Sequence, residues 1–311
     1  MKKILLLLVF IGFSNTISAQ QDPQYTQYMY NMSVVNPSYA TATPNVLNLG
    51  GLYRTQWVGS VGGPKTMTFF AHKPVNRNVE LGVSFISDDI GDGAKKENSL
   101  FADFAYVLEF SEKHRLSLGL KAGAVLFNTN FNGFQLESGD NTTDKAFEKN
   151  INSVFPNVGA GAFYFTDKYY VGLSAPNLLS TKHIEERDGI SRFGSENIHI
   201  FLTSGYVFQL NQNLKFKPSF MAKGVKGAPV TLDVSANFLF NDRFELGASY
   251  RLDDAVSGLF NIKITPELRV GYAYDYTLSN LGEFNSGTHE VFLLFDLDFF
   301  KKGYDKSPRF F

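Results

Sequence analysis

The sequence predicts an all-β protein: a transmembrane, antiparallel, up-and-down β-barrel of about 14 strands with a polar lumen. Three observations support this prediction. Segments that alternate apolar and polar residues follow one another along most of the chain. Most of them reach or exceed the roughly 9–11 residues that a tilted strand needs to cross a bilayer. The connections between them are short at every second position and often long at the others.

The first 19 residues have the pattern of a secretory signal peptide. Lys2 and Lys3 give a basic start, an apolar run extends from Ile4 to Phe13, and small and polar residues lead to Ala19. A membrane anchor fits less well, because the uninterrupted apolar run is about half of the roughly 20 residues that a spanning helix needs. We therefore expect cleavage after Ala19 and an exported mature chain.

Residues 20–45 lie outside the strand pattern and are rich in Gln, Asn and Tyr. Tyr25, Tyr28, Tyr30 and Tyr39 make the segment more aromatic than a disordered linker would be. We expect it to pack, either inside the barrel as a plug or on a periplasmic partner.

Residues 46–299 carry the predicted barrel. Each segment alternates with a period of two, and no segment between them has a sustained apolar pattern at helical spacing. The predicted strands are 46–56, 65–75, 78–88, 97–110, 114–127, 155–165, 168–175, 196–209, 213–223, 229–240, 243–253, 256–264, 267–277 and 288–299.

The connections differ systematically in length. Those after the even-numbered segments are short and polar, for example NRN at 76–78 and NDR at 241–243, whereas two of the others span about 128–154 and 176–195. Short turns at one end and long loops at the other are typical of outer-membrane barrels. An even number of strands places the first and the last strand terminus, and so both ends of the chain, on the same side of the membrane. We expect an outer-membrane protein with its N-terminus and its C-terminal tail, 300–311, in the periplasm.

The two faces of the strands predict what each side meets. In NDRFELGASYRLDD (241–254), the apolar residues lie on one face of the strand, which we expect to meet lipid. The charged residues lie on the other face, which we expect to meet the lumen. Charges of both signs can pair inside the barrel. The predicted lumen charge network consists of Glu245, Arg251, Asp253, Lys263, Arg269, Asp275 and Glu290.

The two long loops are the predicted partner contacts, because loops on a rigid scaffold commonly carry binding. They combine mixed charge with scattered apolar residues. These residues are Phe131, Phe134, Phe147, Ile184, Ile190 and Phe193.

Composition argues against several other functions. The net charge of −1 gives no support for nucleic-acid binding, and the absence of Cys excludes thiolate chemistry. GSVGGPKT (59–66) has Pro64 where a phosphate loop needs Gly, and DDIGDG (88–93) has Ile90 at a calcium-ligand position. We predict no catalytic set, no metal site and no cofactor, leaving open weak divalent-ion binding at 88–93.

Several motifs resemble the PorP/SprF family, the outer-membrane barrels of the type IX secretion system in Bacteroidetes. The residues that carry the resemblance are QDPQYTQYMYN (21–31), NPSYA (36–40), YRTQWVG (53–59), GGPKT (62–66), GLSAPNLL (172–179), KPSF (217–220), GAPVTLD (227–233), YRLDDA (250–255), GYAYDYT (271–277) and SGTHE (286–290). They appear in the expected order over the whole mature chain.

The resemblance implies a non-enzymatic role: support for the export or surface retention of one large secreted protein, adhesin-like and in some cases related to gliding motility. The implied partners are that protein, with its type IX sorting domain, and other secretion components. Two alternatives remain open at this stage. One is a transport channel for small or apolar solutes, and the other is a barrel enzyme that assembles Ser, His and Asp from different strands.

Overall fold

The computed structural model describes residues 23–41, 46–111, 113–132, 150–179, 197–226 and 228–298. It also describes the backbone of the short segments 135–136, 139–140, 182–187 and 190–195.

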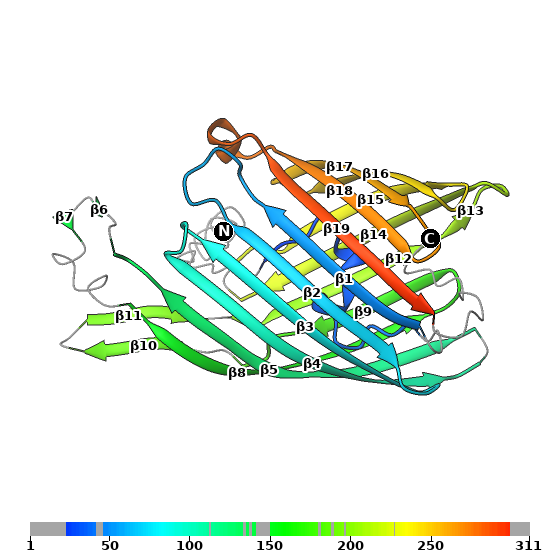
Figure 1. The fold of residues 1–311 in the computed structure, drawn as a ribbon, viewed down its shortest axis with the longest axis horizontal. Coiled ribbons are helices and arrows are strands. Elements are labelled where there is room, and N and C mark those ends of the chain that lie inside the picture. The colour runs from blue at the N-terminus through cyan, green and yellow to red at the C-terminus, as the bar shows by residue number, and fades with distance from the viewer. Residues whose placement is uncertain are drawn as a thin grey trace, which may run out of the picture.

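The described strands form one large antiparallel sheet that closes on itself (Figure 1). Strands that are neighbours in the sheet are mostly neighbours in sequence; β1 pairs with β19, and β12 with β14 completes the ring. Only Val207 separates β12 from the short β13, so the two together act as one barrel strand. The sheet strands are β1 (Val46–Thr55), β2 (Lys65–Pro74), β3 (Val79–Ile90), β4 (Lys95–Glu109), β5 (Arg115–Thr129), β8 (Asn152–Phe165), β9 (Tyr169–Ala175), β12 (His199–Tyr206), β13 (Phe208–Gln209), β14 (Leu214–Val225), β15 (Thr231–Phe240), β16 (Phe244–Arg251), β17 (Ala255–Lys263), β18 (Leu268–Thr277) and β19 (Thr288–Asp298).

The predicted fold class is confirmed: the described residues form a closed antiparallel barrel of 14 strands. Every predicted segment overlaps one of these strands. The main departure is that β4, β5 and β8 are 15, 15 and 14 residues long and exceed their predicted ranges. Their extra residues lie at the end where the long connections are, so this part of the sheet extends beyond the shorter strands.

The two ends of the barrel differ, as their connections predict. We call one end of the barrel the turn end; its connections are 75–78, 110–114, 166–168, 210–213, 241–243 and 264–267. The other end, here the loop end, includes the connections 130–151 and 176–198. Those two contain the small hairpins β6 (Gln135–Leu136) with β7 (Gly139–Asp140), and β10 (Lys182–Arg187) with β11 (Ile190–Ser195). Figure 1 shows both hairpins at the same end of the barrel.

The outer face of the barrel is apolar. In β16 exposed and buried positions alternate, with Leu246 and Tyr250 about half exposed on the outside and Glu245 fully buried inside. The same holds for β4, where Leu100 and Phe104 point outward. Many large apolar side chains exposed around a closed sheet suit a hydrocarbon environment. Within the described part of the chain, no helix is long and apolar enough to cross a membrane.

Candidate functional site in the barrel lumen

Residues 23–41, which we call the plug, lie inside the barrel (Figure 1). They contain two short helices, η1 (Tyr28–Tyr30) and α2 (Met32–Val35), and every residue from 25 to 41 is buried. The plug's aromatic side chains pack on those of the wall: the rings of Tyr30 and Phe292 stack at 4.6 Å. The Tyr-rich composition of this segment therefore forms an apolar core within the lumen.

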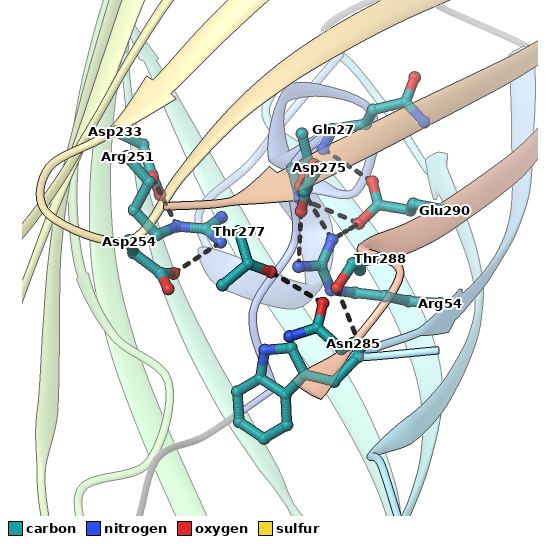
Figure 2. A network of polar contacts seen from close by, with 12 residues as sticks. Gln27, Arg54, Asp233, Arg251, Asp254, Asp275, Thr277, Asn285, Thr288 and Glu290 are labelled. Atoms are coloured by element: carbon teal, nitrogen blue, oxygen red, sulfur yellow. Dashed lines mark hydrogen bonds and ion pairs between the residues drawn. The ribbon is translucent and has the colours of Figure 1, made fainter. Parts of the chain in front are cut away.

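Arg54 of β1 is the centre of the polar contacts that hold the start of the plug (Figure 2). Its Nη2 atom lies 2.8 Å from Asp275 Oδ2, and its Nη1 atom lies 2.9 Å from Glu290 Oε2. Nη1 also donates to Thr26 Oγ1 of the plug at 2.8 Å. The three charged side chains are at most 3% exposed, so each depends on these contacts in place of water.

The plug supplies the donors that this cluster needs. Around Arg54 two carboxylates face one guanidinium, which leaves an excess of acceptors on the wall. Glu290 accepts hydrogen bonds from the backbone N–H groups of Thr26 and Gln27 at 2.9 and 2.7 Å. Thr26 Oγ1 donates to Asp275 at 2.7 Å. The wall and the plug therefore satisfy one another, and neither is complete alone.

A second anchor lies deeper, on Glu245 of β16. The Tyr30 hydroxyl donates to Glu245 Oε2, which also accepts from Arg269 Nη1 at 3.1 Å. Asn237 Nδ2 donates to the other carboxylate oxygen at 2.7 Å. One tyrosine of the plug is thereby tied to three strands of the wall.

A third anchor holds the last residue of the plug. The backbone N–H of Thr41 donates to both carboxylate oxygens of Glu80, at 2.7 and 2.8 Å, and its hydroxyl donates at 2.6 Å. Glu80 is the second residue of β3, at the turn end, whereas Arg54 lies one residue before the loop end of β1. The plug therefore crosses the lumen from the loop end to the turn end.

The opposite wall receives the plug through small residues. A Cβ atom on Gly119 of β5 would lie 2.4 Å from the carbonyl oxygen of Pro37, and one on Gly161 of β8 would lie 2.2 Å from Asn36 Oδ1. These glycines let the two backbones approach closely. The plug carbonyls on this side are also satisfied: Ser174 Oγ donates to Val35 O at 2.9 Å.

The structure places most members of the predicted lumen charge network inside the barrel, in separate contacts. Asp275 and Glu290 belong to the Arg54 cluster, and Arg269 contacts Glu245. Arg251 Nε lies 2.7 Å from Asp233 Oδ1, its direct partner on the neighbouring strand (Figure 2). Lys263 is half-buried at the turn end of β17.

The expected position of Asp253 is wrong. It lies in the turn after β16 with a φ of 58°, and its side chain is exposed. Arg251 contacts Asp254 Oδ2 at 3.4 Å instead. The alternation of the strand stops at the turn, so counting by two past Arg251 no longer gives the side-chain direction.

The sequence reading did not single out Arg54, Glu80, Thr26 or Thr41, although they make the central plug contacts. One available signal was the position of Arg54 and Glu80 on the lumen side of the alternating pattern. The partners of these groups lie 28 to 264 residues away in the chain, so spacing gives no indication of them.

Only some of the six predicted partner-contact residues lie in the part of the chain that the structure describes. Phe131 is half-buried, and its backbone N–H donates to Asn150 Oδ1 at 2.9 Å. Phe134 and Phe147 lie outside the described residues. Ile184 is on β10, Ile190 and Phe193 are on β11, and the backbones of Ile184 and Phe193 are direct partners. Their role in binding a partner stays a prediction.

The acidic loop 88–93 uses its carboxylates internally. Asp88 accepts from Thr66 Oγ1 at 2.6 Å, and Asp89 accepts from the N–H of Gly93 at 2.7 Å. Lys65 Nζ lies 2.9 Å from Asp92, and this hydrogen bond lowers the pKa of the Asp92 carboxyl. Among the described residues, no group of three or more His, Cys, Asp or Glu side chains could hold a metal ion.

The barrel, its apolar belt and its filled lumen define a plugged outer-membrane β-barrel. The sequence profile of the type IX secretion system membrane protein PorP/SprF matches residues 17–295. The chain belongs to this family. No curated protein sequence matches it at a significant level.

Two solved structures are similar to this chain at low sequence identity. The Pseudomonas putida toluene transporter TodX is 10% identical with a TM-score of 0.50, covering 86% of this chain and 94% of that one. The outer-membrane protein Omp33 of Acinetobacter baumannii is 11% identical with a TM-score of 0.46, covering 84% of this chain and 100% of that one. At 10% sequence identity, the similarity to TodX supports the barrel fold alone.

Proposed function

We propose that the protein is a non-enzymatic outer-membrane subunit that supports the export or surface retention of one large secreted protein. Family membership supports a role in type IX secretion. The two predicted contact loops, which are the connections 130–151 and 176–198, would make the partner contacts. For the loops to reach a secreted partner, the loop end of the barrel would face the exterior and the turn end would face the periplasm. The tail after β19 would then be periplasmic.

The filled lumen is the observation that favours this proposal over the alternative of a transport channel. The plug closes the lumen with buried side chains and is anchored at both ends by carboxylates. A solute would have to displace these hydrogen bonds, and each buried group left unpaired would cost about 1–3 kcal/mol. A barrel held closed in this way suits a docking platform.

Deletion of the gene tests the role directly. We expect one large protein to disappear from the cell surface while other type IX substrates are still secreted. Shortening either 130–151 or 176–198 should reproduce this loss while the barrel still assembles, as judged by heat-modifiable migration on gels. Shortening 278–287, at the same end, is the matched control and should keep the partner. A deletion strain that retains every large surface protein would overturn the proposal.

Conductance separates the proposal from the channel alternative. In planar bilayers the intact protein should show no steady open pore, whereas a variant that lacks residues 23–41 should conduct. Stable conductance or solute uptake by the intact protein would favour a channel.

A further inference from the structure

A cavity of about 80 Å³ lies between the plug and the wall. We call it the mouth pocket. Several of its wall residues lie near the loop ends of their strands: Asp88 is two residues before the end of β3, Lys223 two before the end of β14, and Thr231 begins β15. Pro176 directly follows β9. The pocket is therefore at the end of the barrel that carries the long loops.

The plug itself forms the base of this pocket. Pro23, Gln24 and Tyr25 contribute from the start of the plug, and Val34 and Val35 contribute from α2. The start of the plug is thus at the loop end, next to the Arg54 cluster.

The side walls are mainly apolar and already closely packed. Phe101, Phe201 and Met221 line the pocket and are 4–6% exposed. Asp88, Lys223 and Thr231 line the pocket near the loop ends of their strands, and Lys121 lines it beside the plug, where its Nζ atom donates to Val34 O at 3.2 Å. A largely apolar pocket whose buried cation is already bonded to the plug, with further polar groups at its rim, suits an apolar group that is attached to a hydrogen-bonding backbone.

We propose that the mouth pocket receives one aliphatic or aromatic side chain of the secreted partner protein, with the plug as its floor. This inference rests on the proposed function. The pocket has the size of a single side chain, and below it the buried plug closes the lumen. An apolar group that enters meets the buried side chains of the plug below it.

This arrangement gives the plug a second role. The periplasmic position of the N-terminus and of the C-terminal tail stays a prediction, since the structure describes the chain only from Pro23. β1 does begin at the turn end, but the preceding plug returns through the lumen, and Pro23 lies at the loop end. The plug therefore exposes its first residues on the side where the partner binds.

Single-cysteine labelling on intact cells tests the position of the pocket, since the natural chain contains no cysteine. A membrane-impermeant maleimide should label Gln24→Cys in cells that lack the partner. Val61→Cys, in an almost fully exposed residue of a loop-end connection, is the positive control, and Arg77→Cys, in a turn-end connection, is the negative control. Labelling of Gln24→Cys no faster than Arg77→Cys would overturn the proposal.

Occupancy is tested in the same variant. The presence of the partner should slow labelling of Gln24→Cys several-fold and leave Val61→Cys unchanged. Equal rates with and without the partner would contradict the proposal. Benzene added to the purified, partner-free protein distinguishes a free solute: if it protects Gln24→Cys as well as the partner does, the pocket is a solute site and the assignment fails.

Filling the pocket tests its contribution to binding. Ser99 lines the pocket, and the adjacent Leu100 faces outward on the same strand. Ser99→Phe should weaken retention of the partner by about ten- to a hundredfold, the contribution of one buried apolar side chain. Leu100→Phe, which also enlarges its residue, should not. Assembly of both variants is checked by heat-modifiable migration.

The outcomes separate the two proposals. If loop shortening releases the partner but Ser99→Phe retains it, the pocket assignment is wrong and the docking role stands. If gene deletion changes no surface protein, the docking role itself is wrong. If Ser99→Phe does not assemble, the labelling rates of Gln24→Cys decide.

Discussion

The plug lies between two walls of different chemistry. On one side, β1, β16, β18 and β19 present charged groups that hydrogen-bond to it, with Arg54, Glu245 and Glu290 at the centre. On the other side, β5, β8 and β9 present mainly glycine and serine, and the plug backbone approaches the wall directly. The one charged contact described there is Lys121 of β5, whose Nζ atom donates to Val34 O at 3.2 Å. The first wall fixes the plug through directional polar contacts, and the second through close fit.

The difference shows how a lumen can be polar and still hold a packed segment. Directional hydrogen bonds to buried carboxylates specify one orientation of the plug, because a shifted backbone would leave charged groups unpaired. The small-residue wall gives room for that orientation and adds single donors, from Ser174 and Lys121, to carbonyl groups of the plug. The effects of substitutions on the two walls should therefore differ in magnitude and in kind.

The largest effect is expected at Arg54. Arg54→Met leaves the carboxylates of Asp275 and Glu290 buried without their cation, so the protein should lose about 3–5 kcal/mol of unfolding free energy. Urea titration of the detergent-solubilised barrel, followed by gel migration, measures this. Lys65→Met is the control: it removes an exposed ion pair with Asp92 and should leave stability unchanged. Equal behaviour of the two variants would show that the charged wall does not hold the plug.

A smaller effect is expected on the close-fitting wall. Gly161→Val places atoms where Asn36 now lies, and overpacking of this kind costs about 1–3 kcal/mol. The plug should also be displaced, which planar-bilayer conductance would detect as openings absent from the natural protein. Gly258→Val is the matched control, because a Cβ atom there meets nothing within 4 Å. A closed, fully stable Gly161→Val barrel would mean that the fit on this wall is looser than described.

The smallest effect is expected from one hydrogen bond. Ser174→Ala removes the donor to Val35 O and should cost about 0.5–1.5 kcal/mol. Ser204→Ala removes a comparable bond to Tyr170 O within the wall alone. Hydrogen exchange measured by mass spectrometry should show faster exchange in plug peptides for Ser174→Ala only. Faster plug exchange in both variants would indicate that the plug responds to general weakening of the barrel.

Much of the fold follows from local pattern. The period-two alternation in segments such as 243–253 determines which face meets lipid, and the short polar turns after even-numbered segments fix the two ends. Asp253 shows the limit of this reasoning, because a turn residue with positive φ no longer follows the alternation. The extra length of β4, β5 and β8 was missed because residues beyond the membrane face are under weaker pressure to alternate.

The candidate site could be predicted only in part. Lumen charges such as Glu245, Arg269 and Asp275 can be recognised from the face they occupy, but their partners cannot. Arg54 meets Glu290 because β1 and β19 close the ring, and it meets Asp275 because β18 is next to β19. Neither contact has a local signature, since the residues are 236 and 221 positions apart.

The sequence by itself determined the barrel, its strand number and the side that each strand residue faces, because side-chain direction along a strand depends only on neighbours in the chain. It also marked residues 20–45 as a segment that must pack. The tertiary structure decided where that segment packs and in which direction. The lumen is assembled from residues distant in sequence, and only the closed ring brings Arg54, Glu245 and Glu80 into position to bind the plug at three places.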